Sequence, residues 1–442
     1  MDTRAVAFAP ARAECSAKSR LRVGVLVDLP LGPRSGGHVR CWERLAQAAL
    51  DFADILDLTV HFIGETSEGR ALGETVRYRL LPPVFGTERL SFLSHVPDHT
   101  DLAPRHRRLE RMLAHYDVIH TTDAYFAYAR TALRFGARHH IPIVNSVHTN
   151  TPEYARLFTA QTIERLLGDG RATRLLLDRL RVPERVEARM LRQLAAYQRR
   201  CAFALVSRPD RLEATQALLG GRAGLLRRGI DHRLFDPAKR DRAWLSKTYG
   251  IPPERLVVIC AGRLNRGKNV LLLAETMAAL VAAGVDAQLF CAGEGEDRAA
   301  ILERLGPRAT CPGSVETEDL ARLYASADLF AFPSRIEEAA NVVLEALASG
   351  LPALVARDGG MGRVIADGET GLVLPGNDSE PWFAATAMLA ADGERRHRMG
   401  RAARRFAERA VPSWGNVLAE DLLPRWQEAA GVPRRDEASA AA

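Results

Sequence analysis

Short apolar runs alternate along this chain with longer stretches in which apolar residues recur at helical spacing. The short runs are rich in β-branched residues and end in glycine or polar residues, as buried parallel strands do. They predict strands at residues 21–29, 58–63, 117–120, 142–148 and 202–207, and again at 256–261, 287–292, 329–333, 352–356 and 371–374. Helical patterns lie between most of them, for example at 40–54, 270–283, 319–326 and 342–349.

The alternation of strand and helix occurs twice, which predicts an α/β protein with two doubly wound, Rossmann-like domains. A chain of 442 residues is also too long for one ordinary hydrophobic core. We expect a first domain at residues 21–208, a second at 209–411, a disordered leader at 1–20 and a disordered tail at 431–442. Ligands bind at the carboxyl ends of parallel strands, so two facing sheets predict a central cleft.

The composition narrows the class of protein. The six cysteines form no C-x-x-C pair and no cluster with histidine, so we expect reduced thiols, a cytoplasmic protein and no metal site. The first twenty residues contain no long apolar core of the kind a secretory signal needs. Apolar runs elsewhere are shorter than the ~20 residues of a membrane-spanning helix.

The net charge of +7 is concentrated in one segment, from Arg165 to Arg200, which holds ten arginines and only four acidic residues. Apolar residues fall between these arginines at helical spacing: Leu175, Leu176, Leu177, Leu180, Val186, Met190, Leu194 and Tyr197. Such a surface suits anionic lipid headgroups. Nucleic acid, the other polyanion, lacks support because Tyr197 is the only aromatic residue among these arginines, too few for aromatic interleaving. The alternative, an ordinary core face with solvated arginines, remains open.

Two glycine-containing loops follow predicted strands and suit phosphate. The first, with Gly36 and Gly37, precedes a helix whose positive end favours an anion, although a plain surface turn fits equally well. The second runs from Gly262 and places Arg263 and Lys268 after an apolar strand. It nearly matches a P-loop, but Asn269 stands where a Mg²⁺-binding hydroxyl is needed.

Two further stretches carry polar groups at strand ends. His148 ends the strand predicted at 142–148, where it can hydrogen-bond a sugar hydroxyl or serve a structural role. Glu337 and Glu345 flank the expected start of a helix capped by Asn341. If Glu337 lies in the loop, both carboxylates can bind diols on either side of an anion held by the helix start at Ala340, Asn341 and Val342.

Seven motifs in order resemble the retaining GT-B glycosyltransferases of family 4, also called group 1, over most of the chain. They are G-G at 36–37, R-G-I-D-x-x-x-F-D-P at 228–237, G-R-L-x-x-x-K at 262–268, G-E-G at 293–295, A-R-L-Y-A-S-A-D-L-F-A-F-P-S at 321–334, the two glutamates before A-L-A-S-G-L-P, and D-G-x-T-G-L at 367–372. The resemblance implies that 21–208 is the acceptor-side domain, completed by a crossover helix at about 412–430. It implies that 209–411 binds the nucleotide sugar.

The resemblance also implies a role for each site residue. Arg263 and Lys268 would neutralise the diphosphate, Glu345 would bind the ribose, and Glu337 would bind the hexose beside its anomeric carbon. His148 would contact the sugar from the other domain, while Gly36 and Gly37 would approach the donor. Such enzymes retain the anomeric configuration and need neither a metal nor another cofactor.

We therefore expect a hexosyltransferase that uses a UDP- or GDP-sugar and acts on a glycan or lipid, in the cytoplasm or at the inner face of the membrane. Two alternatives remain open. One is a degenerate sugar-nucleotide-binding protein, because Ala339, Ala340 and Arg363 depart from the family pattern. The other is a P-loop-like phosphotransferase, against which Asn269 argues.

Overall fold

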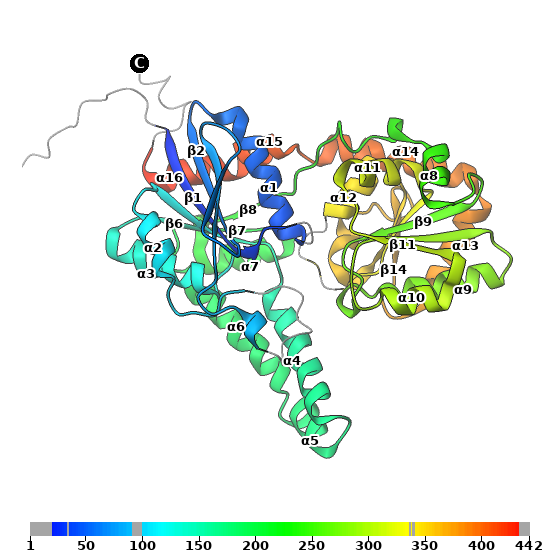
Figure 1. The fold of residues 1–442 in the computed structure, drawn as a ribbon, viewed down its shortest axis with the longest axis horizontal. Coiled ribbons are helices and arrows are strands. Elements are labelled where there is room, and N and C mark those ends of the chain that lie inside the picture. The colour runs from blue at the N-terminus through cyan, green and yellow to red at the C-terminus, as the bar shows by residue number, and fades with distance from the viewer. Residues whose placement is uncertain (1–19, 33–34, 91–99, 336, 338–340, 433–442) are drawn as a thin grey trace, which may run out of the picture.

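Two α/β domains lie side by side in the computed structural model of this chain (Figure 1). The structure describes residues 20–32, 35–90, 100–335, 337 and 341–432. The expected leader and tail fall almost wholly outside these residues, as does Ala340. The prediction of two doubly wound domains is confirmed by the two separate sheets.

The first sheet has the strand order β3-β4-β2-β1-β5-β6-β7-β8. Its strands are β1 (Leu21–Pro30), β2 (Leu56–Ile63), β3 (Glu68–Ala71), β4 (Val76–Leu81), β5 (Val118–Thr121), β6 (Ile143–Val147), β7 (Phe203–Val206) and β8 (Ala223–Leu225). Every neighbouring pair is parallel except β3 with β4. The parallel strands all point their carboxyl ends toward one edge, where a ligand can bind.

The second sheet is parallel throughout, with the order β11-β10-β9-β12-β13-β14. Its strands are β9 (Leu256–Ala261), β10 (Ala287–Ala292), β11 (Ala309–Gly313), β12 (Leu329–Phe332), β13 (Ala353–Ala356) and β14 (Gly371–Leu374). The predicted strands of this half match to within one residue. Four of them, β9, β10, β12 and β13, are fully buried, and burial on both faces of a parallel sheet favours such continuous, largely apolar runs.

Helices cover both faces of the sheets. Those associated with the first sheet are α1 (Gly37–Ala49), α2 (Arg107–Leu113), α3 (Ala127–His139) and α7 (Pro209–Leu219). Those around the second are α8 (Arg242–Tyr249), α9 (Val270–Ala282), α10 (Arg298–Leu305), α11 (Thr317–Ser326), α12 (Asn341–Ala348), α13 (Ser379–Ala391) and α14 (Gly393–Ala410).

Four strands were not predicted. β3 reads EGRA and is exposed throughout, while β8 has only three residues, so neither carries an apolar pattern. β11 contains Pro312, which an edge strand tolerates. Since β8 is the last strand of the first sheet, the first domain extends beyond residue 208, and the expected boundary at 209 falls too early.

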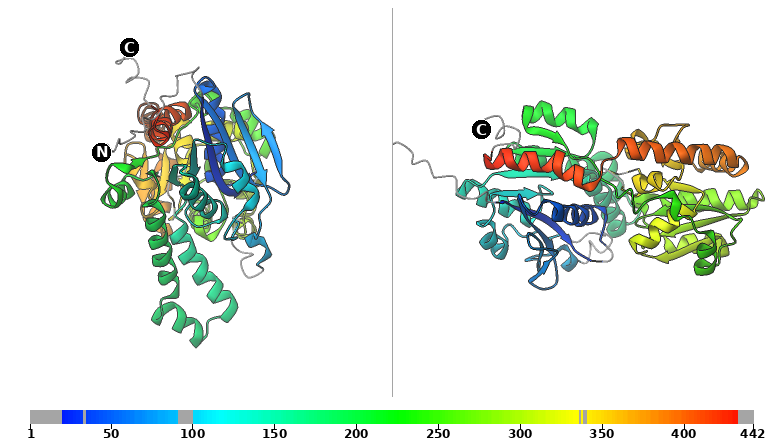
Figure 2. Two further views of the ribbon diagram at one scale, coloured as in Figure 1. Left: turned by 90° about the vertical axis from the view of Figure 1, so that its left-hand side faces the viewer. Right: turned by 90° about the horizontal axis from the view of Figure 1, so that it is seen from above.

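The end of the described chain returns to the first domain. α14 lies on the second domain, and α15 (Trp414–Val417), the π-helical turn Leu418–Leu422 and α16 (Leu423–Ala430) continue from it across the top of the molecule (Figure 2). Trp414, Val417, Leu422 and Trp426 are buried in the same core as β1 and β2. Their burial stabilises the docking of this segment by the hydrophobic effect.

A two-helix arm projects away from the first sheet (Figures 1 and 2). It consists of α4 (Thr151–Leu167), α5 (Arg171–Arg174), the π-helical turn Leu175–Arg179 and α6 (Val182–Gln198). An ion pair between Arg156 and Glu187, 3.2 Å apart, joins α4 to α6. This arm contains the arginine-rich segment, whose predicted helical character is confirmed.

Candidate functional site

A cavity of about 900 Å³ lies between the two domains. It is bordered by residues that end or follow β1, β6, β9, β10 and β12, so both sheets present their carboxyl edges to it. The predicted site residues that the structure describes all line this cavity: Gly36, Gly37, His148, Arg263, Lys268, Glu337, Asn341, Val342 and Glu345. The structure thus brings together side chains separated by up to 309 positions in the sequence.

Lys268 and Glu337 form an ion pair at the cavity wall. Lys268 ends the short 3₁₀ turn Arg266–Lys268 after β9, and Glu337 lies in the loop between β12 and α12. Ser334 Oγ donates a hydrogen bond of 3.0 Å to Glu337 Oε1. Burial lowers the pKa of Lys268, but the charge and hydrogen bond of Glu337, together with the nearby Tyr154, outweigh it, and the net pKa is raised. The lysine is therefore a fixed cation at neutral pH.

Arg263 reaches across the cleft to the glycine loop of the first domain. A Cβ atom at Gly36 would lie 2.6 Å from Arg263 Nη2, closer than a side chain allows. Gly36 therefore leaves room for the guanidinium, whereas a Cβ at Gly37 would face open space. The two cations that the sequence assigned to phosphate thus stand on one side of the cavity, with the start of α1 opposite.

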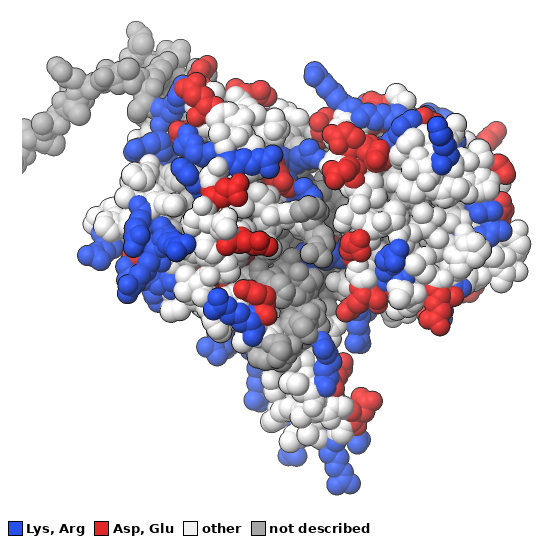
Figure 3. Space-filling view, in the orientation of Figure 1, with Lys and Arg blue, Asp and Glu red and all other residues white. Residues whose placement is uncertain are grey.

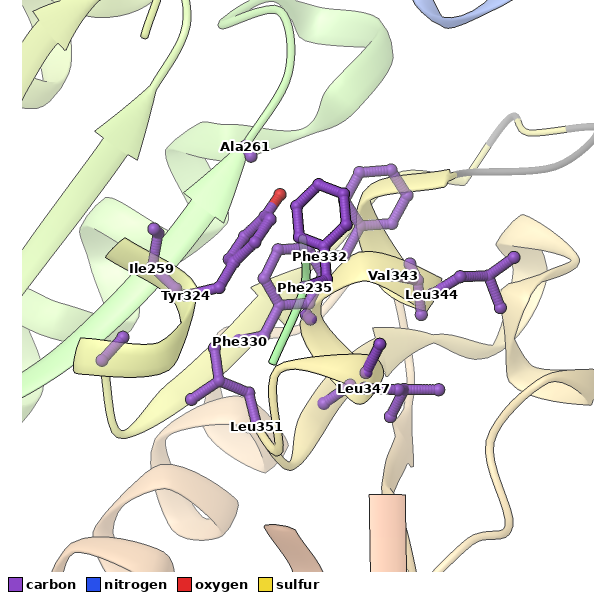
Figure 4. Close-up of a cluster of buried hydrophobic side chains, with 14 of the residues drawn as sticks. Phe235, Ile259, Ala261, Tyr324, Phe330, Phe332, Val343, Leu344, Leu347 and Leu351 are labelled. Atoms are coloured by element: carbon purple, nitrogen blue, oxygen red, sulfur yellow. The ribbon is translucent and has the colours of Figure 1, made fainter. Parts of the chain in front are cut away.

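Helix α12 holds Glu345 at the cavity because its other face is apolar. Val343 and Leu347 are fully buried and point into the core formed with Phe330, Tyr324 and neighbouring residues (Figure 4). Glu345 lies on the remaining, partly exposed side. Glu337 precedes the helix, which begins at Asn341, so the two acids are not both helical.

The environment of Glu345 makes its ionisation difficult. Burial raises its pKa to about 7, and Arg44 of α1 moves it in the opposite direction to a smaller extent. The carboxyl group is therefore about half protonated near neutral pH. Nearby, Asn341 Oδ1 is shielded from solvent and has no hydrogen-bond partner among the described residues. Both groups can accept hydrogen bonds from a bound ligand.

His148 lies at the centre of a buried hydrogen-bond network. Arg228 Nη1 is 3.0 Å from His148 Nδ1, Ser146 Oγ is 2.7 Å from His148 Nε2, and Trp42 Nε1 is 3.3 Å from the same Nε2. A neutral imidazole accepts one hydrogen bond only, and the closer, charged donor is Arg228. Nδ1 therefore faces the charged donor Arg228, and Nε2 faces both the Ser146 hydroxyl and the Trp42 N–H.

This arrangement keeps His148 neutral. Burial, followed by the neighbouring His38 and Arg228, holds its pKa well below the ordinary value. The two rings of His38 and His148 stack with their centroids 4.5 Å apart. Because both ring nitrogens already have partners inside the protein, His148 lines the cavity without a free nitrogen aimed at it.

Several site residues carried no recognised signal in the sequence. Tyr154 of α4 lies against Lys268 and Glu337, whose charges both act on its pKa, which burial raises. Arg208, just after β7, donates to the backbone oxygen of Glu337 at 3.3 Å. Tyr154 stands in the stretch H-T-N-T-P-E-Y beside His148, so the polar cluster after that strand was a usable clue. Nothing in the pattern around Arg208 distinguishes it.

Arg363, one of the departures from the family pattern, contacts the other domain. Its guanidinium lies 3.3 Å from Asp210 of α7. Asp210 is also bound by Arg208 at 2.6 Å, so one carboxylate connects Arg363 with the residue that touches Glu337. The sequence alone could not predict this pair because its members are 153 positions apart in different domains.

The described residues contain no group of three or more histidine, cysteine, aspartate or glutamate side chains arranged to bind a metal ion. Within the same part of the chain, no helix combines the length and apolar character needed to cross a membrane. The five cysteines in the described ranges are buried and form no disulfide.

Comparison with known proteins relates the sequence to one family. Residues 241–406 match the family model described as Glycosyl transferases group 1. The chain is 33% identical over 206 residues to Sulfoquinovosyl transferase SQD2 of Arabidopsis thaliana, which covers 45% of this chain and 39% of that protein. It is 29% identical over 335 residues to the D-inositol 3-phosphate glycosyltransferase of Saccharomonospora viridis. That alignment covers 71% of this chain and 70% of that protein. The chain spans 39%, 52% and 61% of the lengths of three such relatives.

Solved structures extend the similarity to both domains. Sucrose-phosphate synthase from Thermosynechococcus elongatus superposes with a TM-score of 0.67 at 18% identity and covers 93% of this chain and 100% of its own. HepE of Anabaena, solved in complex with UDP-glucose, superposes with a TM-score of 0.60 at 17% identity. This superposition covers 95% of this chain and 100% of HepE. At such identities the likeness concerns the fold. We conclude that this chain has the two-domain GT-B fold and that its residues 241–406 are similar to the group 1 glycosyltransferases.

Proposed function

We propose that this protein is a retaining hexosyltransferase that uses a nucleoside-diphosphate sugar, with UDP or GDP as the nucleotide. The observation that supports it best is the single cavity in which Arg263 and Lys268 stand beside Glu337 and Glu345. Two fixed cations suit a diphosphate, and two separate carboxylates suit two sets of sugar hydroxyls. The names of relatives agree, since they include a GDP-mannose-dependent alpha-mannosyltransferase of Corynebacterium glutamicum and HepE bound to UDP-glucose.

In this proposal the diphosphate lies between the two cations and the start of α12. Glu345 accepts hydrogen bonds from the ribose, and Glu337 accepts them from the hexose. Lys268, now paired with Glu337, turns toward the phosphate as negative charge develops on the leaving group. Arg263 adds a second positive charge, so the leaving nucleotide is stabilised by side chains of this chain and no metal ion or other cofactor is required by the mechanism.

Transfer then breaks the bond between the anomeric carbon and the phosphate oxygen. The acceptor hydroxyl forms its new bond on the same face of the sugar, and its proton passes to the departing phosphate. A dedicated protein base is not part of this scheme. His148 acts by position, because its nitrogens are held by Arg228 and Ser146 and its pKa is low.

The two-helix arm supports an acceptor at a membrane surface. Most of its arginines are exposed, and positively charged side chains project from its edges and tip with uncharged surface between them (Figure 3). We place the protein in the cytoplasm, at the inner face of the membrane through Arg165 to Arg200. A glycan or lipid of glycolipid or cell-envelope synthesis would be the acceptor. Binding to vesicles with and without anionic lipid tests this placement.

The decisive experiment incubates purified protein with UDP-, GDP- and ADP-sugars and measures nucleotide release with and without a membrane-lipid extract. Acceptor-dependent release of UDP or GDP, with a product of retained anomeric configuration, supports the proposal. Donor binding with no release under any condition identifies a degenerate binding protein instead. Transfer of a phosphoryl group, seen as a phosphorylated acceptor, identifies the phosphotransferase alternative.

A further inference from the structure

The cavity does not end at the donor residues but continues along the two-helix arm. Six residues of α4 line it, and they fall on one side of the helix at positions i, i+1, i+4, i+5, i+8 and i+9: Tyr154, Ala155, Phe158, Thr159, Thr162 and Ile163. The rest of this wall comes from Leu176, Val182 and Met190, with Phe126 at its base. From Tyr154 to Ile163 a helix rises about 14 Å.

This extension, the arm groove, differs in chemistry from the donor end of the cavity. Its side chains are apolar or hydroxyl-bearing, while the charged groups Lys268, Glu337 and Glu345 lie at the other end. Helix α4 is 17 residues long, yet Pro152 is its only buried residue. A helix whose apolar side lines a cavity, and does not pack against the hydrophobic core, is typical of binding surfaces.

The end of the arm is apolar and basic at the same time. Leu166 and Leu175 are 66% and 46% exposed, beside exposed arginines such as Arg171 and Arg174. Leucines that can enter the boundary of a bilayer, next to cations that can bind its headgroups, are the pairing that a peripheral membrane contact needs. The groove therefore runs from the donor residues toward a surface of lipid-binding chemistry.

We infer that the arm groove binds the hydrocarbon portion of an acceptor lipid, and that the lipid's hydroxyl headgroup reaches the sugar near Glu337. This inference rests on the proposed function, and it specifies the acceptor as an amphipathic lipid and not a free glycan. The apolar lining between Tyr154 and Ile163 accounts for binding, and the continuity of the cavity places the hydroxyl at the donor end.

Two adjacent residues of α6 give a matched pair of variants. Met190 lines the groove, whereas Leu191 is 44% exposed and does not line it. The probe is 1-decanoyl-glycerol carrying an NBD fluorophore, whose emission rises in an apolar site, with NBD-glycerol as the chain-free control. We expect Met190→Asp to weaken binding of the acyl probe by at least about tenfold and Leu191→Asp to change it by less than about twofold.

Phe158→Asp is the second groove variant, because Met190 also packs against the core of the first domain. Circular dichroism and thermal unfolding check that each variant is folded. Equal probe binding by Met190→Asp, Phe158→Asp and Leu191→Asp, or equal binding of the chain-free control by the wild type, overturns the inference. So does a concentration-dependent dimer that Met190→Asp abolishes, since a second copy would then occupy the groove.

Donor binding separates this inference from the proposed function. Thermal-shift measurements with UDP- and GDP-sugars are made on the same three variants, which leave the donor residues unchanged. If the wild type binds and consumes a donor but not the acyl probe, the inference fails and the proposed function stands. If the probe binds in the groove but no nucleotide is released with any donor, the proposed function fails and, because the inference depends on it, the acceptor role fails as well.

Discussion

The two walls of the cleft use different physical means to present their residues. On the second domain, Lys268, Glu337 and Arg263 are charged and lie within a few residues of strand ends, and Lys268 pairs directly with Glu337. On the first domain, His148 is neutral and held inside a hydrogen-bond network, and the arm groove is lined by apolar or hydroxyl-bearing side chains. In the proposed transfer the second-domain wall binds the anionic donor and the first-domain wall binds the acceptor, so we call them the donor wall and the acceptor wall.

The difference between the two walls also explains why the residues of only one wall could be recognised from short sequence motifs. The donor wall is local: Arg263 and Lys268 follow one buried strand, and Glu337 and Glu345 follow another. Each can be recognised from its own short motif because a parallel strand fixes where its next residues lie. On the acceptor wall, Arg228 and His148 meet across 80 positions, and no short pattern encodes that contact.

The largest expected effect concerns the donor wall. Lys268→Ala removes the cation to which we assign stabilisation of the leaving phosphate, and it also removes the ion-pair partner of Glu337. We expect kcat to fall by about 10²–10³-fold, the size seen when one preorganised charge-stabilising group is lost. Steady-state kinetics of nucleotide release measures it, with Lys247→Ala, an exposed lysine of α8, as the control. A fall of less than about threefold would remove Lys268 from the proposed mechanism.

The next effect tests the neutral acceptor wall. Arg228→Met leaves His148 Nδ1 and the thiol of Cys41 without the donor that now serves both. We expect kcat/KM for transfer to fall by about tenfold while donor affinity changes little, because a buried network loses one charged partner. Nitrogen NMR of His148 is the independent readout. The wild type should show a neutral ring held in a single tautomer, and the variant should lose that fixed tautomer.

The fold was more predictable than the site. Ten of the strands were visible as apolar runs, because burial on both faces forces such sequences. β4 was missed although V-R-Y-R-L-L alternates, and β3, β8 and β11 carry too little apolar pattern to be seen. The arm shows the same limit, since the spacing of its leucines predicted helices but not the side that lines the cavity.

A smaller effect is the pH dependence of donor affinity that the ionisation of Glu345 should produce. Since the pKa of Glu345 is raised to about 7, the carboxylate that we propose as the acceptor of ribose hydrogen bonds forms as the pH rises from 6 to 8. We expect donor affinity to rise by about fivefold over that range in the wild type and to be low and independent of pH in Glu345→Gln. Isothermal titration with UDP or GDP at each pH measures it, and an unchanged pH profile in the variant would assign the titration to another group.

The same raised pKa has a consequence for stability without ligand. The pKa of Glu345 is higher in the folded than in the unfolded protein. Its contribution to the free energy of unfolding is therefore fully present below about pH 4.5 and is lost as the pH rises through 7. Glu345→Gln should therefore raise the melting temperature of the free protein at pH 8 more than at pH 5. The variant would gain stability where it loses donor affinity, as residues selected for binding often do.

The smallest effect tests the contact between the walls themselves. Arg363 is 62% exposed where it pairs with Asp210, and exposed ion pairs contribute about 0–1 kcal/mol. Arg363→Ala should therefore weaken donor binding by only about twofold, and the difference from wild type should vanish at about 1 M salt because screening removes the pair. Arg357→Ala, on the same domain but outside this pair, is the control. A tenfold loss that persisted in high salt would mean that this contact, and not the charged donor wall, sets the geometry in which Lys268 meets the phosphate.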